Sequence, residues 1–112
     1  MGGVMQGYQL QFFTEQNKRH GHQTLYEWLV ETAREQEIPG ATVFMGAIGY
    51  GHQRRLHAAH FFELGDQPVE IAMVVTAEQA ARLFDVLKRE NVRLFYVKIP
   101  VEFGESGEPV TS

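Results

Sequence analysis

The chain has no cysteine among its 112 residues. This absence excludes a disulfide framework, a zinc site built from thiolates and a cysteine nucleophile, and it is typical of a reducing compartment. The sequence also lacks any apolar run near the ~20 residues that a membrane-spanning helix needs. Residues 1–5 lack the basic and apolar regions of a signal peptide. We therefore expect a cytoplasmic protein of bacterial type.

An excess of positive charge is missing too. The formal net charge is -4, with 10 Lys and Arg against 14 Asp and Glu. Because such a chain has no general attraction for a phosphate backbone, we expect no nucleic-acid partner. Serine is restricted to Ser106 and Ser112 near the C-terminus, and no inward-facing pair of carboxylates stands out. The sequence therefore predicts no catalytic residues and no enzymatic activity.

Length and composition predict one folded domain over residues 1–112. Hydrophobic residues make up 44% and charged residues 21% of the chain, which is ordinary for a globular protein. The last residues are rich in Gly, Glu, Ser, Pro and Thr. We therefore expect an ordered core over about residues 6–103 and a flexible tail over residues 104–112.

Hydrophobic periodicity predicts the order strand, helix, strand, strand, helix, strand. The expected strands are 8–14, 41–50, 69–75 and 92–103, and the expected loops are 15–23 and 52–59. Thr24 with Glu27, and Thr76 with Gln79, resemble capping boxes that open the two helices. Pro39 and Gly40 should end the first helix at about residue 37. With right-handed crossovers, this order predicts an α+β, ferredoxin-like βαββαβ sandwich, in which one antiparallel sheet carries two helices on one face.

The face of the sheet without helices should also be apolar. In the last two strands both alternating sets contain large apolar residues, for example Met73 beside Val74 and Phe95 beside Tyr96. An uncovered apolar sheet face usually binds a partner, and symmetric self-association is the simplest arrangement that covers it. The alternative is that a loop or the tail of the same chain covers part of it.

Residues 40–53 read Gly-Ala-Thr-Val-Phe-Met-Gly-Ala-Ile-Gly-Tyr-Gly-His-Gln. This segment resembles the second strand of PII signalling proteins, which carry Gly-x-Thr-Val and then Gly-aromatic-Gly-x-Gln before a long mobile loop. Leu25-Tyr26-Glu27 and Pro68-Val69-Glu70-Ile71 extend the resemblance to the PII-like family called domain of unknown function 190. Together these motifs cover about residues 8–101.

The resemblance implies a homotrimer with its sheets packed inward. It also implies that a small ligand, an adenine nucleotide or another anion, binds between subunits, and that the protein regulates a partner such as a membrane transporter or an enzyme. Glycines let a backbone approach such a ligand closely, and the Gln53 amide both donates and accepts hydrogen bonds. The two arginines that follow Gln53 suit a phosphate or an acidic partner. The implied ligand-binding residues are Gly40 (which would set the turn), Thr42, Gly49, Gly51, Gln53, Arg54 and Arg55. The alternative is that these glycines only shape a bulge and a subunit contact.

The chain departs from PII proteins in two places. They carry a second glycine-rich phosphate loop before the last strand and basic residues after it, whereas residues 88–93 contain no glycine and residues 102–105 are acidic here. The loop over residues 52–60 is also shorter. A triphosphate would lack its usual cradle. The sequence therefore indicates a less charged ligand, another anion site that uses Arg54, Arg55, Lys88 or Arg89, or no nucleotide.

Two further interpretations stay open at this point. Five histidines, His20, His22, His52, His57 and His60, all fall in expected loops, and trimers of the copper-tolerance CutA type share the architecture. Their spacing matches no standard metal motif, so we assign no metal ligands, and we expect no cofactor other than an adenine nucleotide as ligand. The third interpretation is a ligand-independent protein interaction module.

Overall fold

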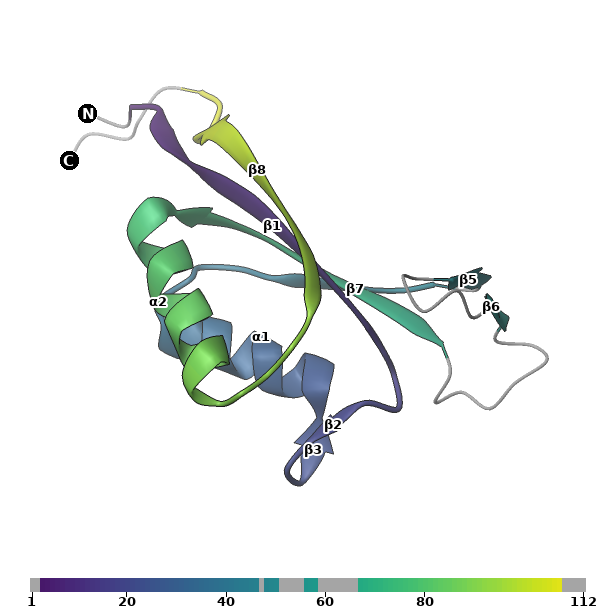
Figure 1. The fold of residues 1–112 in the computed structure, drawn as a ribbon. Coiled ribbons are helices and arrows are strands. Elements are labelled where there is room, and N and C mark those ends of the chain that lie inside the picture. Colours follow the sequence, from purple (N-terminus) through teal and green to yellow (C-terminus); the bar gives the residue numbers. More distant parts are fainter. Residues whose placement is uncertain (1–2, 47, 51–55, 59–66, 108–112) are drawn as a thin grey trace.

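The computed structural model describes residues 3–46, 48–50, 56–58 and 67–107 (Figure 1). Two helices and eight strands follow one another in this part of the chain. They are β1 (Met5–Glu15), β2 (Arg19–His20), β3 (Gln23–Thr24), α1 (Leu25–Glu35), β4 (Thr42–Met45), β5 (Ile48–Tyr50), β6 (Leu56–Ala58), β7 (Pro68–Thr76), α2 (Ala77–Arg89) and β8 (Phe95–Phe103).

Four of these strands form one antiparallel sheet in the order β4-β7-β1-β8. The register places Phe12 of β1 between Ile71 of β7 and Tyr96 of β8. Both helices lie on one face of this sheet (Figure 1). The ferredoxin-like α+β fold expected from the sequence is confirmed, because the two central strands are the first and third of the four in chain order.

The core lies between this sheet and the two helices. Alternate residues of β1 and β7 point toward the helices, as the period of two in a strand requires. Each helix contributes an apolar stripe at helical spacing. The buried core residues of the described part are Leu10, Phe12, Leu25, Leu29, Ala33, Ile38, Val69, Ile71, Met73, Val75, Ala80, Leu83 and Leu87.

Threonine caps begin both helices, as the sequence predicts. At α2 the box is complete: Thr76 Oγ1 accepts from the Gln79 N–H at 3.1 Å, and Gln79 Oε1 accepts from the Thr76 N–H at 2.9 Å. At α1 only half of it forms. Thr24 Oγ1 accepts from the Glu27 N–H at 3.3 Å. The Glu27 carboxylate accepts from the Thr24 hydroxyl at 2.8 Å, instead of from the backbone N–H of Thr24 as in a complete box.

The expected polar loop over residues 15–23 contains a hairpin, so this prediction is wrong in part. Strands β2 and β3 pair through Arg19 and Thr24, and the turn between them holds Gly21 at a φ of 65°. Glycine adopts this left-handed conformation without steric cost, which lets the chain reverse over two residues.

The expected strand over residues 41–50 is divided. Strand β4 ends at Met45, and β5 pairs with β6, which lies inside the expected loop over residues 52–59. The division follows from the extent of the partner strand. β7 begins at Pro68, whose carbonyl accepts from the Gly46 N–H at 2.7 Å, so at Gly46 the chain has reached the end of its partner strand.

The last strand also begins later than expected, at Phe95 instead of residue 92. The Val92 N–H donates to the Leu87 carbonyl at 2.9 Å, and Asn91 has a φ of 57°. These residues therefore close the C-terminal end of α2, and they are not free to join the sheet.

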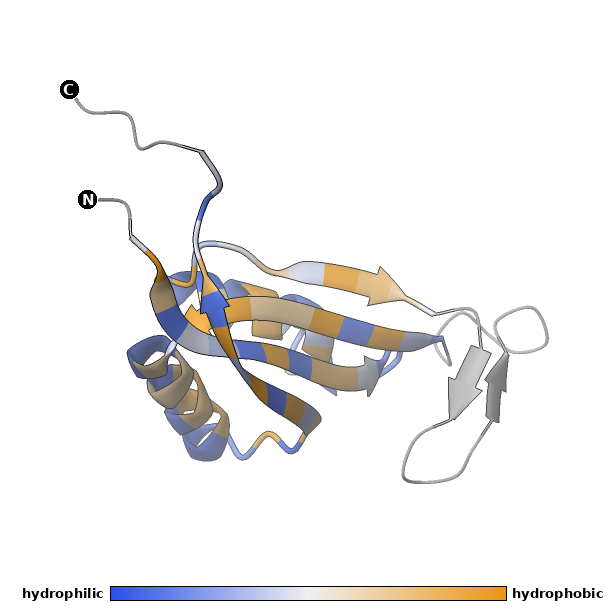
Figure 2. Ribbon diagram, turned by 90° about the horizontal axis from the view of Figure 1, so that it is seen from above, coloured by the Kyte–Doolittle hydropathy of each residue, from blue (hydrophilic) through white to orange (hydrophobic). Residues whose placement is uncertain are grey.

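The sheet face opposite the helices, which we call the open face, is covered by no described helix. Its exposed large apolar side chains lie mostly near the rims, and Gln11 in the middle donates to Glu70 Oε2 at 3.1 Å. Apolar and polar residues alternate along the strands in Figure 2, and successive residues of a strand point to opposite faces. The open face is therefore more polar than the face that carries the helices, and the expectation of an apolar open face is met only in part. The apolar residues are Phe13, Phe44, Val74, Phe95 and Ile99, whose exposed fractions lie between 36% and 55%.

Candidate functional site

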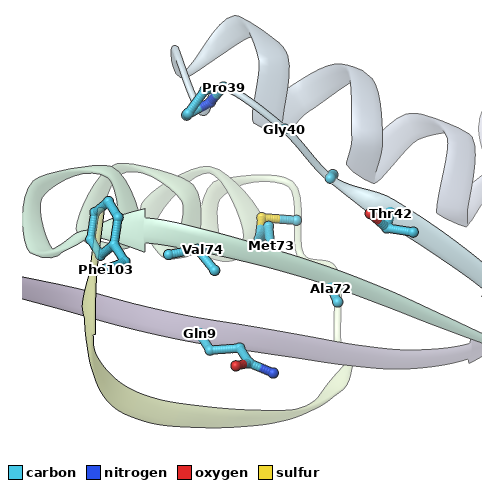
Figure 3. A pocket seen from close by; sticks show the side chains of 9 residues that line it. Gln9, Pro39, Gly40, Thr42, Ala72, Met73, Val74 and Phe103 are labelled. Carbon is cyan, nitrogen blue, oxygen red and sulfur yellow. The ribbon is translucent and has the colours of Figure 1, made fainter. Parts of the chain in front are cut away.

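A hollow of about 520 Å³ lies beside the beginning of β4 (Figure 3). It forms because β4 pairs with β7 only from Thr42 onward, opposite Ala72, so the preceding residues diverge from β7. One wall is the connector from α1, and the other is β7. The lining residues are Gln9, Pro39, Gly40, Ala41, Thr42, Ala72, Met73, Val74 and Phe103.

The hollow belongs to the open face. Gln9, Thr42 and Val74 point to this side. Each of them alternates along its own strand with residues whose side chains face the helices. Apolar groups dominate the lining, with the Gln9 amide and the Thr42 hydroxyl as polar side chains and no charged side chain among the described lining residues. This composition suits a flat, mainly apolar group with a few hydrogen-bonding atoms at its edge.

Gly40 stands out because the fold does not require a glycine there. A Cβ added at Gly40 meets nothing within 4 Å, and its φ is not in the left-handed region. Gly7 behaves in the opposite way, since a Cβ there would collide with the Val75 carbonyl oxygen. Packing and backbone conformation therefore do not explain the glycine at position 40, which lines the hollow.

Phe103 forms one end of the hollow, although no motif in the sequence points to it. Its ring lies over Gly7, where an added Cβ would be 2.9 Å from Phe103 Cε1. No motif points to Gln9 or Val74 either. They lie on separate strands, and only the registers of β1 with β7 and of β4 with β7 bring them beside Thr42.

The other predicted ligand-binding residues do not line the hollow in the described part of the chain. Gly49 lies in β5, opposite His57. Lys88 and Arg89 lie in the last turn of α2, where Arg89 Nε forms an ion pair with Asp85 Oδ2 at 3.2 Å. Gly51, Gln53, Arg54 and Arg55 lie outside the described residues.

The side chain of His20 makes two contacts, whereas the contact at His22 involves its backbone carbonyl. His20 Nε2 lies 3.2 Å from Glu90 Oε1, and its ring centroid lies 4.2 Å from that of Trp28. The His22 carbonyl accepts from Arg19. Among the residues that the structure describes, no three His, Asp or Glu side chains come together in a way that suits a metal ion. His52 and His60 lie outside this part.

No described helix is both long and apolar enough to cross a membrane.

Two comparisons of the sequence found similar proteins. The model of the DUF190 family, described as "Uncharacterized ACR", matches residues 7–97. A UPF0166 protein from Aquifex aeolicus (strain VF5) is 29% identical over 83 residues, which covers 73% of this chain and 79% of the relative.

Solved structures of PII-like proteins share the fold. A proposed PII-like signalling protein from Thermus thermophilus gives a TM-score of 0.66 at 16% identity. The match covers 90% of this chain and 92% of the Thermus chain. CPII from Thiomonas intermedia K12, a nitrogen regulatory PII-like protein bound to ADP, AMP and bicarbonate, gives 0.68 at 15% identity and covers 94% of each chain. The chain therefore has a PII-like, ferredoxin-like fold and belongs to the DUF190 family.

Proposed function

We propose that this protein is a cytoplasmic PII-like signalling protein that binds an adenine nucleotide in the hollow beside Gly40 and Thr42. It works as a homotrimer, with the hollow at a seam between subunits. Ligand binding there changes how the protein acts on a partner such as a transporter or an enzyme, and the protein is not itself an enzyme.

The observation that carries this proposal is the free space at Gly40 within the hollow. The volume of about 520 Å³ lies within the ~300–1,000 Å³ of ligand sites. An adenine ring is flat and apolar on both faces, which suits Val74 and the aromatic ring of Phe103. Its polar edge can pair with the Thr42 hydroxyl and with the Gln9 amide, which both donates and accepts.

The phosphates need cations that the described lining does not supply. Arg54 and Arg55 follow β5 in the sequence, and Lys88 and Arg89 of a neighbouring subunit are a second source of positive charge. With so few cations and no second glycine-rich loop, a mono- or diphosphate suits the site better than a triphosphate. The ADP and AMP bound to CPII support this choice.

The open face supports the homotrimer. Phe44 and Phe95 near its two rims are 52% and 55% exposed, which is unfavourable in water. The polar pair in the middle, Gln11 and Glu70, already share a hydrogen bond, which lowers the cost of covering them. Because the hollow opens on this face, association would place it next to a neighbouring subunit.

Gly40→Leu tests the nucleotide site. We expect ADP or AMP at a hundred times its Kd to stabilise the native protein by about 2.7 kcal/mol, seen as a rise of several degrees in Tm. The leucine should abolish this rise without lowering the Tm of the free protein, because nothing lies within 4 Å of the added Cβ. Ala81→Leu adds the same side chain on the exposed side of α2 and should keep the full rise.

Thr42→Val tests the polar contact separately. The substitution keeps the shape and removes the hydroxyl, so the affinity for ADP should fall about three- to tenfold. Wild-type protein whose Tm responds to neither ADP nor AMP, or a Gly40→Leu variant that keeps the full response, would contradict the proposed site.

A further inference from the structure

We infer that Gln79 and Arg82 of α2 are positioning residues for the hollow, because they clamp the connector between α1 and β4, residues 36–41. The clamp itself is a property of the free protein, whereas its effect on ligand affinity rests on the proposed function.

Two hydrogen bonds form the clamp. Gln79 Nε2 donates to the Glu37 carbonyl at 2.9 Å, and Arg82 Nη2 donates to the Gln36 carbonyl at 3.1 Å. Carbonyls at the C-terminal end of a helix have no partner within that helix and need one elsewhere. The side chains of α2 meet this need for α1, and they thereby fix the start of the connector.

The first residues of the connector are also attached to α1 itself. The N–H of Gln36 donates to the Thr32 and Ala33 carbonyls at 3.0 and 3.1 Å, and the N–H of Glu37 donates to the Arg34 carbonyl at 3.0 Å. Ile38 is buried, at 4% exposed, and its N–H donates to the Ala33 carbonyl at 3.1 Å. Beyond Ile38, none of the backbone hydrogen bonds that the described residues make outside helices and strands involves residues 39–41, and pairing with β7 starts only at Thr42. This wall of the hollow is therefore held at Ile38 and at Thr42, and the clamp acts next to Ile38, at Glu37.

Gln79 also joins this wall to the opposite one. Its Oε1 accepts from the N–H of Thr76, the last residue of β7, while its Nε2 holds Glu37. Residues 72–74 of the same strand form the other wall of the hollow. One amide group therefore links the strand behind one wall to the connector behind the other, so it sets the separation between them.

Gln79→Glu breaks the clamp selectively. A glutamate at this position still accepts from the Thr76 N–H and so preserves the capping box. Its second oxygen cannot donate to the Glu37 carbonyl, and the two oxygens repel each other. Ala81→Glu is the matched control, because it adds the same charge two residues away on an exposed part of α2.

Two measurements test the inference: amide hydrogen exchange of the ligand-free protein and calorimetric titration with ADP. In Gln79→Glu we expect faster exchange at the amides of Glu37 and Ile38, whose N–H groups donate to the Arg34 and Ala33 carbonyls. We also expect an affinity for ADP about three- to tenfold lower, with the exchange of the α2 amides unchanged. Arg82→Met, which removes the second donor but keeps an apolar stem, should change both readouts in the same direction. Ala81→Glu should change neither.

The outcomes separate the two claims. Unchanged exchange at the amides of Glu37 and Ile38 in Gln79→Glu would refute the clamp. Faster exchange with unchanged ADP affinity would show that the clamp does not position the site, and the inference would fall. Wild-type protein that binds neither ADP nor AMP would overturn the proposed ligand. Amide hydrogen exchange of the ligand-free protein would still test the clamp, because that measurement needs no ligand.

Discussion

Replacing Ile99 with glutamate should dissociate the proposed homotrimer while leaving each subunit folded. Ile99 lies on β8 and points to the open face, where 40% of the residue is exposed in the single chain. A carboxylate at this position keeps contact with water in the free subunit, so its effect on folding should be small. Once a neighbouring subunit covers the position, the same carboxylate loses its water.

The size of the effect follows from this exposed fraction. The exposed part of Ile99 is roughly 70 Å², and covering it contributes about 2 kcal/mol per subunit at about 25 cal/mol per Å². The substitution removes this contribution and adds several kcal/mol for burying an unpaired charge. A total of at least about 4 kcal/mol weakens each contact by about a thousandfold or more.

Light scattering during size-exclusion chromatography measures the outcome. Wild-type protein at micromolar concentration should give roughly 38 kDa, three times the 12.8 kDa of one chain, and Ile99→Glu should give the single-chain mass. Ala81→Glu on α2 should keep the wild-type mass, and circular dichroism should show the native fold in both variants. A monomeric wild-type protein, or an Ile99→Glu variant that still forms trimers, would refute the argument.

Two further substitutions test the packing that supports the site. Gly7→Ala should destabilise the protein by about 1–3 kcal/mol in urea unfolding, because the added methyl group meets the Val75 carbonyl oxygen and lies 2.9 Å from Phe103 Cε1; an unchanged midpoint would contradict this. Thr76→Ala should cost about 1 kcal/mol, since it removes the hydroxyl that caps α2, and the reasoning fails if the Tm does not fall.

Much of the fold could be predicted because its signals are local. The caps at Thr24 and Thr76 act over three residues, and both helices begin where the sequence predicts. The alternation along β1 and β7 identifies both strands. The errors arise where a residue far away in the sequence determines the end of an element. The strand expected over residues 41–50 is divided because Gly46 lies against Pro68, at the end of its partner strand.

The candidate site could be predicted only in part. The motif that resembles PII proteins identified Gly40 and Thr42, and both line the hollow. Phe103 carries no such motif, since its role depends on lying over Gly7, almost a full chain length away in the sequence. The positions of Gly51 and Gln53 stay a prediction, because these residues lie outside the described part of the chain.

The amino-acid sequence alone determined the kinds of elements, their order and the starts of both helices, because periodicity and capping depend on neighbours within a few residues. Only the tertiary structure decided the hollow and the clamp. The hydrogen bond from Gln79 to the Glu37 carbonyl joins residues 42 positions apart. Such contacts depend on strand register and helix docking, which bring distant residues within hydrogen-bonding distance only when the whole chain is folded.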